Sequence, residues 1–234
     1  MNFVNLQHPI RWIFIFHVIG GSVALGAFLI PLISKKGGKL HIKAGWTYSY
    51  AMILVGLSAF VITPWRVFFD SARTPSSQGF ALFLFFIAFF TLSALWDGLS
   101  VLKLKNRKAP SKDFRHLAPP AATVLLAFVT QLMGLHLHDN LLIGFPFIGY
   151  FLAAGQFHYW LTAPKEKMHW WYAHMNGMIT ACIATVTAFA VIAVPRIWPS
   201  PIAHSLVLWI APGLVLGTIL GRWTVFYKNQ FGDA

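Results

Sequence analysis

The chain consists of long apolar stretches separated by short polar segments. Seven stretches come close to or exceed the 20 or so residues that a helix needs to cross a bilayer. They are residues 10–33, 45–65, 79–102, 119–136, 141–161, 172–194 and 203–222. Apolar residues follow one another in these stretches without the alternation of membrane-barrel strands. The pattern therefore predicts an all-α protein, a polytopic bundle of seven transmembrane helices that forms one domain over residues 1–234.

The composition supports this class. Hydrophobic residues make up 57% of the 234 residues, and charged residues only 10%. A soluble domain of this length could not bury so much apolar surface in its core. We therefore expect an integral, multi-pass protein in which lipid covers most of the apolar side chains.

The formal net charge of +12 is distributed unevenly. Most Lys and Arg residues fall on one side of the predicted spans: Lys35, Lys36, Lys39, Lys43, Lys103, Lys105, Arg107, Lys108, Lys112, Arg115, Lys165, Lys167, Arg222 and Lys228. The other side has Arg11, Arg66, Arg73 and Arg196. By the positive-inside rule this predicts an N-terminus outside and a C-terminus in the cytoplasm, with the chain in the plasma (inner) membrane. The basic excess is thus explained by topology, with weak attraction to membrane lipids, and nucleic acid is not an expected partner.

The ten histidines fall into two layers under this topology. The outer layer holds His17, His136, His138 and His204, with His8 just beyond the first span. The inner layer holds Asp97 together with His41, His116, His158, His169 and His174. An ionisable group within lipid is costly unless it has a partner, so these positions are the candidate functional site.

Three of these histidines lie beside small residues on one helix face. His17 is followed by Gly20, Gly21 and Ala24, His158 is preceded by Ala154 and Gly155, and His174 is followed by Gly177 and Ala181. Such a face accepts either a flat macrocycle or a neighbouring helix. One hypothesis is therefore a site for haem b, with its cofactor contacts drawn from His17, Gly21, His136, His158 and His174. The alternative is ordinary helix packing.

A second hypothesis is a divalent metal site, for which Zn²⁺ is the natural ion. No compact HExxH motif is present, so the ligands would come from different helices. Imidazoles and a carboxylate near one membrane face suit zinc, and the candidates are Asp97, His41, His158, His169 and His174. For Asp97 the alternative is an ion pair with Lys103 or Lys105.

Several stretches resemble a known family. They are residues 17–26 (HVIGGSVALG), 39–48 (KLHIKAGWTY), 169–178 (HWWYAHMNGM) and 183–189 (IATVTAF). Together they resemble the bacterial membrane proteins catalogued as domain of unknown function 2306. The resemblance implies a multi-helix membrane protein with recurrent histidines at His17, His41, His169 and His174. Where that family commonly has His-Arg before a glycine, this chain has His41-Ile42-Lys43, and the resemblance implies no established activity.

Three functions remain open from the sequence. The first is electron transfer by a haem or redox metal, with a quinone or another subunit of a membrane complex as partner. The second is an accessory subunit or small-solute transporter without catalysis. The third is a zinc-dependent intramembrane lipid hydrolase, in which the metal activates a bound water. An absorption spectrum combined with metal analysis separates them.

Overall fold

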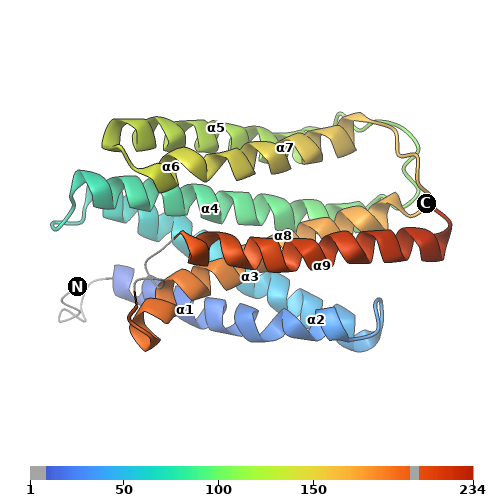
Figure 1. Cartoon of the computed structure of the whole chain (residues 1–234), viewed down its shortest axis with the longest axis horizontal. Helices are drawn as coiled ribbons and strands as arrows, with labels where there is room; N and C mark the ends of the chain where they lie inside the picture. Colours follow the sequence, from blue (N-terminus) through green and yellow to red (C-terminus); the bar gives the residue numbers. More distant parts are fainter. Residues whose placement is uncertain (1–8, 201–205, 234) are drawn as a thin grey trace. The chain divides into compact units, whose positions relative to one another are not determined.

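We analysed a computed structural model, which describes residues 9–200 and 206–233. Its helices are α1 (Ile10–Ala27), α2 (Leu29–Ile33), α3 (Lys39–Phe68), α4 (Pro75–Ser100), α5 (Phe114–Leu137), α6 (Asn140–Gly144), α7 (Pro146–Leu161), α8 (His169–Ile197) and α9 (Val207–Phe231) (Figure 1). A short 3₁₀ helix, η1 (Val101–Lys103), extends α4. The described residues contain no strand. The predicted all-α class is confirmed.

Among the residues that the structure describes, seven segments are long and apolar enough to cross a membrane: Ile10–Ile33, Lys39–Phe68, Pro75–Lys103, Phe114–Leu137, Asn140–Leu161, His169–Ile197 and Val207–Phe231. The predicted number of spans is therefore confirmed, and the chain has the features of a multi-pass membrane protein. The first predicted residues of the seventh span, including His204, lie outside the described residues, as does His8. The orientation across the membrane stays a prediction.

Several helices reach beyond the predicted spans. Lys39 and Lys43 lie between the predicted spans 10–33 and 45–65, which predicts a connection there, but α3 begins at Lys39. This expectation was wrong because long basic side chains can remain on a helix and still extend to water.

The pair Pro119-Pro120 was expected in the first turn of a helix, but α5 begins earlier, at Phe114. A proline cannot donate to the carbonyl four residues before it. For Pro119 this is the carbonyl of Arg115, which instead accepts a hydrogen bond of 2.9 Å from the Trp96 indole. A side chain of another helix thus satisfies the carbonyl that the proline leaves without a donor.

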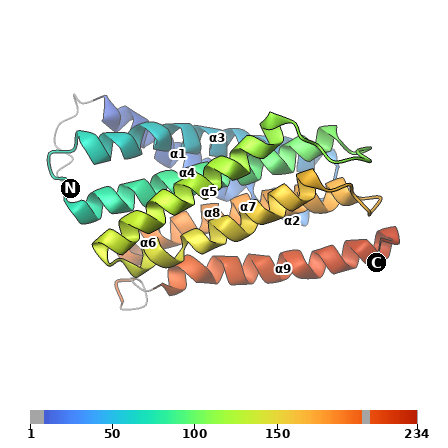
Figure 2. The same cartoon turned by 90° about the horizontal axis from the view of Figure 1, so that it is seen from above.

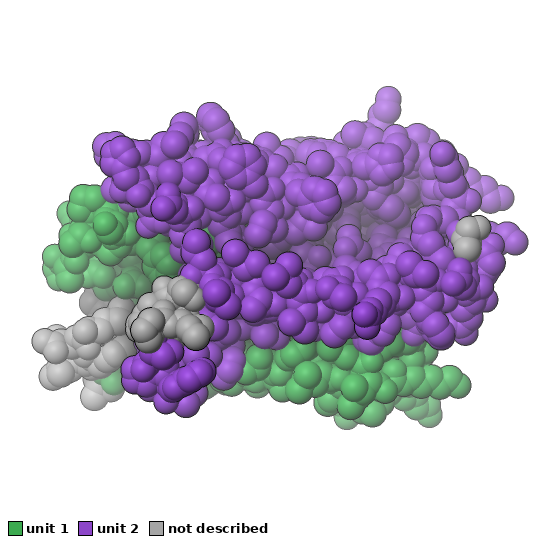
Figure 3. Space-filling model, viewed as in Figure 1, with its two compact units in different colours: residues 1–89 green, residues 90–234 purple. Residues whose placement is uncertain are grey.

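The helices form two compact units, residues 1–89 and residues 90–234 (Figure 3). In the first unit α1 packs along α3. Ala24 and Tyr48 are buried in this unit. A Cβ on Gly20 would lie 3.3 Å from the carbonyl oxygen of Ala51, so glycine permits the close approach of the two helices.

In the second unit α7 packs on α5, and α9 packs on α8 (Figure 2). The last turns of α4 contact α8, where Gly98 meets Gly177. The connection over residues 162–168 joins α7 and α8, which pack mainly on α5 and α9 respectively. α7 and α8 line the pocket from two sides and meet where the Tyr159 hydroxyl lies 2.8 Å from Nδ1 of His169.

Candidate functional site

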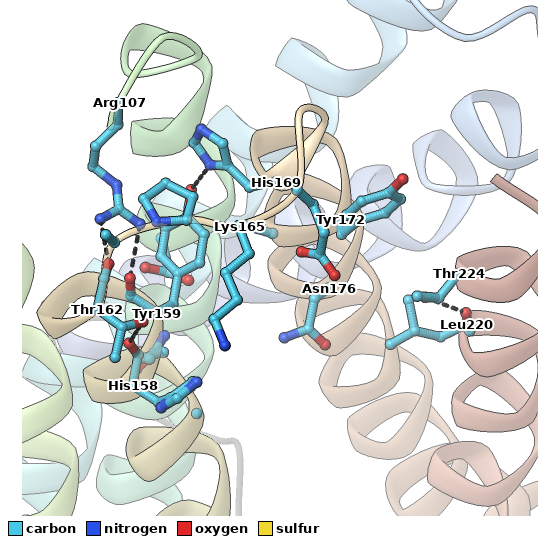
Figure 4. Close-up of a pocket in the computed structure, with 17 residues that line it drawn as sticks. Arg107, His158, Tyr159, Thr162, Lys165, His169, Tyr172, Asn176, Leu220 and Thr224 are labelled. Atoms are coloured by element: carbon cyan, nitrogen blue, oxygen red, sulfur yellow. Dashed lines mark hydrogen bonds between the residues drawn. The ribbon is translucent and has the colours of Figure 1, made fainter. Parts of the chain in front are cut away.

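A pocket of about 620 Å³ lies at one end of the second unit. Its walls come from the end of α4, the last turns of α7, the connection over residues 162–168, α8 and α9. The loop over residues 104–113 adds Arg107. Figure 4 shows the side chains of Lys165 and Asn176 in the space between these helices. This size suits a small organic molecule.

Asp97 is the buried charged residue of the pocket. Its side chain is 8% exposed, and Oδ1 accepts a hydrogen bond of 2.5 Å from the indole Nε1–H of Trp160. The predicted ion pair with Lys103 or Lys105 does not form. The ion pairs of the described residues join Arg115 to Asp113 and Lys228 to Glu166. Asp97 thus meets the pocket without a cationic partner among the described side chains.

Trp160 is held from three sides, and it therefore holds Asp97 in place. Its side chain is 1% exposed, and its ring stacks on that of His116 with 3.9 Å between the centroids and 4° between the planes. Its carbonyl accepts a hydrogen bond of 2.7 Å from the backbone amide of Ser111. The sequence analysis did not select Trp160, because one tryptophan among ten in an apolar chain carries no distinguishing pattern.

Arg107 ties the loop over residues 104–113 to the end of α7. Its guanidinium donates to the carbonyls of Tyr159 at 2.7 Å and of Thr162 at 2.8 Å (Figure 4). It also lies 4.6 Å from the centre of the Tyr159 ring. A cation at the carboxyl end of a helix satisfies its last carbonyls and favours its dipole. Arg107, which sequence reasoning treated only as a topology charge, therefore shapes the pocket.

His169 uses both ring nitrogens for structure. Its Nδ1 accepts from the Tyr159 hydroxyl at 2.8 Å, which leaves Nε2 to donate to the carbonyl of Lys105 at 3.1 Å. A metal ligand needs one nitrogen with an available lone pair. His158, by contrast, is exposed and lines the pocket (Figure 4).

His174 lies apart from these residues. It does not line the pocket, and its Nδ1 donates to the carbonyl of Gly98 at 2.7 Å. Of the proposed zinc ligands, Asp97, His158 and His169 thus share the pocket. Within residues 9–200 and 206–233, no three His, Cys, Asp or Glu side chains are grouped so that they could hold a metal ion. The zinc and haem sites stay predictions.

In the first unit, His17 and His41 have a common geometry. The Nδ1 atom of His17 lies 2.9 Å from the Ser58 hydroxyl and 3.2 Å from the carbonyl of Val55, and that of His41 lies 3.2 Å from the carbonyl of Pro31. When Nδ1 donates to an oxygen, Nε2 carries the lone pair, as in most metal-bound histidines. Lys36 donates to the same Pro31 carbonyl at 2.7 Å, and burial lowers the pKa of this lysine.

The remaining predicted site residues lie elsewhere. A Cβ built on Gly21 would meet no atom within 4 Å, so this glycine faces open space rather than α3. His136 is exposed in the last turn of α5. His138 ends that helix in the left-handed conformation, with φ at 54°.

The end of α9 closes the pocket on one side. The Asp233 carboxylate accepts from the amides of Lys167 and Met168 and from the Tyr172 hydroxyl, each at 3.0 Å. Partial desolvation alone would raise the pKa of Asp233, but these hydrogen bonds lower it below its ordinary value. An ion pair joins Lys228 to Glu166. The wall formed by α9 is thus fastened through polar contacts at its C-terminal end.

Comparison with known proteins does not extend this description. No family model matches the chain, and no match is found among curated proteins or among solved structures. The resemblance in the sequence analysis stays a prediction, and the function has to be argued from the site.

Proposed function

We propose that this chain is a multi-pass membrane protein that binds a small molecule through a positively charged or hydrogen-bond-donating group on Asp97. The function belongs to the class of small-solute transporters and accessory ligand-binding subunits. The observation that carries the proposal is the Asp97 carboxyl, which is buried within a membrane span and lines a pocket without a cationic partner among the described side chains.

The physical argument starts from the cost of burying a carboxyl. A carboxylate inside a membrane needs a counter-charge, hydrogen bonds or a proton. Trp160 supplies one hydrogen bond to Oδ1, and no other hydrogen bond to this carboxyl is found among the described residues. A ligand with an ammonium or hydroxyl group can donate to Oδ2 of Asp97 and so supply the hydrogen bond that this carboxyl lacks. Ionisable residues of this kind commonly mark solute and proton pathways.

The other lining groups support a polar ligand. Gln156, Asn176 and Thr224 line the pocket from α7, α8 and α9. The Thr224 hydroxyl donates to the carbonyl of Leu220, and its oxygen can still accept a hydrogen bond. Lys165, from the connection over residues 162–168, also reaches into the space (Figure 4). In binding sites with mostly apolar walls, a small number of polar groups fixes the orientation of the bound molecule.

A thermal-stability screen in lipid nanodiscs tests this function. Short amines, carboxylates and neutral polyols of matched size are compared at saturating concentration. We expect amines to raise the melting temperature, because a ligand at 100 times its dissociation constant stabilises the folded state by about 2.7 kcal/mol. Asp97→Asn should abolish the shift while keeping an acceptor for Trp160.

The matched control is Asp70→Asn, the same chemical change at a carboxylate that does not line the pocket. It should retain the shift. Equal shifts in the wild type and in Asp97→Asn would remove Asp97 from the proposal.

A second candidate, haem-dependent electron transfer, is favoured by the His17 ring. Its Nδ1 lies within hydrogen-bond distance of Ser58 and Val55, which leaves Nε2 with the lone pair that a haem iron would need. Quinone or another membrane subunit is the partner of this candidate. We expect the purified protein to show a Soret band. The band should disappear in His17→Ala and persist in the His138→Ala control. A spectrum without that band rejects the candidate.

The proposed topology puts the pocket on the cytoplasmic side of a bacterial inner membrane, because the basic loops of the second unit surround it. Reporter fusions after Lys167 should then read as cytoplasmic and those after Asn140 as external. The reverse pattern would place the pocket on the outer side.

A further inference from the structure

The pocket continues into a groove of the second unit. Figure 3 shows the surface of this unit hollowed between the ridge formed by α7 and the ridge formed by α9. Beside the pocket α7 packs on α5 and α9 packs on α8. At their other ends α7 and α9 meet, where the rings of Phe145 and Trp209 have centroids 5.9 Å apart. The groove therefore runs from the polar pocket along the apolar parts of two membrane spans.

The wall of the groove on α7 is open at Gly155. This glycine lines the pocket, and a Cβ built on it would meet no atom within 4 Å. Phe151, one turn earlier on the same helix face, is 78% exposed. Asp97 and Gly155 thus lie in one continuous site, which is charged at one end and apolar at the other.

We propose that the occupant of this site is a long-chain amine, with its ammonium group on Asp97 and its chain in the groove between α7 and α9. The inference rests on the proposed function and specifies its ligand class. Charge complementarity at Asp97 itself selects the amine. The pocket also holds Arg107 and Lys165, but the Arg107 guanidinium donates to backbone carbonyls, and neither cation forms one of the ion pairs found among the described side chains. A groove between spans cannot be left empty, and an alkyl chain fills it without an unsatisfied polar group.

The geometry also explains how such a ligand would reach the site. An amphiphile dissolved in the bilayer already has its chain among apolar helices and its head at the polar boundary. Movement into the groove therefore needs no transfer of the chain through water. Binding energy then comes from the head on Asp97 and from packing, since lipid is as apolar as the groove.

The experiment uses a photoactivatable 12-carbon amine with a diazirine in its chain, at a fixed mole fraction in nanodiscs. A fatty acid of the same length and label reports the lipid background. After illumination, cross-linked peptides are mapped by mass spectrometry. We expect the amine to label α7 around Gly155 and the facing part of α9 at least tenfold above the fatty acid.

Two glycine variants form the matched pair. Gly155→Leu fills the groove and should reduce the labelling by the amine about tenfold. Gly26→Leu also adds its side chain where a Cβ meets no atom within 4 Å, but Gly26 lies on α1 in the first unit and does not line the pocket, so labelling should persist. A melting curve of each variant verifies that it is folded, and the open space at both positions lets the larger side chain be accepted.

The failure of this inference is distinguishable from that of the proposed function. If short amines stabilise the wild type but not Asp97→Asn, while amine and fatty acid label alike, the head site stands and the long-chain ligand is wrong. Equal labelling of Gly155→Leu and Gly26→Leu also overturns it. If Asp97→Asn neither loses the short amines nor reduces the labelling, both proposals are wrong.

Discussion

Two helix faces of the second unit carry the same sequence pattern, a histidine beside a glycine and an alanine, yet they have opposite environments. On α8, Gly177 is closed against α4, and a Cβ there would lie 2.6 Å from the Ala94 carbonyl oxygen and from the Gly98 nitrogen. On α7, Gly155 faces open space beside the exposed His158. Small residues thus serve close packing in one place and a cavity in the other. Only the partner helix distinguishes the two uses.

The largest expected difference in stability is between alanine substitutions of these two glycines. Gly177→Ala forces α4 and α8 apart, and we expect it to lower the free energy of unfolding by about 3 kcal/mol, at the upper end for overpacked sites. Gly155→Ala meets no atom, so it should be neutral or stabilise by up to about 1 kcal/mol through helix propensity. Thermal melting in nanodiscs measures both. Similar losses in the two variants would contradict the contrast.

Alanine substitution of the histidine on α8 should likewise cost more stability than that of the histidine on α7. His174→Ala removes the hydrogen bond to the Gly98 carbonyl and should cost about 1–3 kcal/mol, because this acceptor lies at a tight helix contact. His158→Ala should change stability by less than about 0.5 kcal/mol, as expected for an exposed side chain. A larger loss for His158→Ala would show that the face of α7 is covered.

Substitution of Trp160 tests whether this side chain holds Asp97 in place at the pocket. Trp160→Phe removes the donor to Asp97 and also perturbs the stack on His116. We expect a loss of about 1–2 kcal/mol in stability and a roughly tenfold weaker affinity for amines. Titration in nanodiscs measures the affinity, with Trp209→Phe, outside the pocket, as the control. Unchanged affinity would mean that Trp160 does not position Asp97.

The smallest expected effect concerns the polar contacts that hold the C-terminal end of α9, which forms the other wall of the pocket. The folded pKa of Asp233 is lowered, so its contacts stabilise the protein above the ordinary value of 3.8 and lose this contribution as the pH falls below it. Asp233→Asn should therefore lower the melting temperature slightly at neutral pH, and this difference should shrink as the pH falls below 3.8. Hydrogen exchange of the amides of Lys167 and Met168 reports the same contacts. Identical pH profiles of the variant and the wild type would contradict this role.

The sequence led to part of the site and missed another part. Asp97 stood out because it is a lone carboxylate in an apolar stretch, and His158 and His169 were recognised in the same way. Gln156 and Asn176 are also polar residues within apolar helices, and the same criterion could have found them. Trp160, Tyr159 and Arg107 carry no such mark, because aromatic residues and loop cations are frequent throughout the chain.

What the sequence by itself determined is the class of the molecule: seven apolar helices joined by short polar connections. This follows from local physics, because backbone groups in lipid must be satisfied within the same helix. The tertiary structure decided which helices touch, and hence that Gly177 is closed, Gly155 is open and Asp97 meets Trp160 rather than a lysine. The reason is that hydrophobic periodicity is weak when lipid is as apolar as the protein interior, so the sequence does not reveal which face finds a partner.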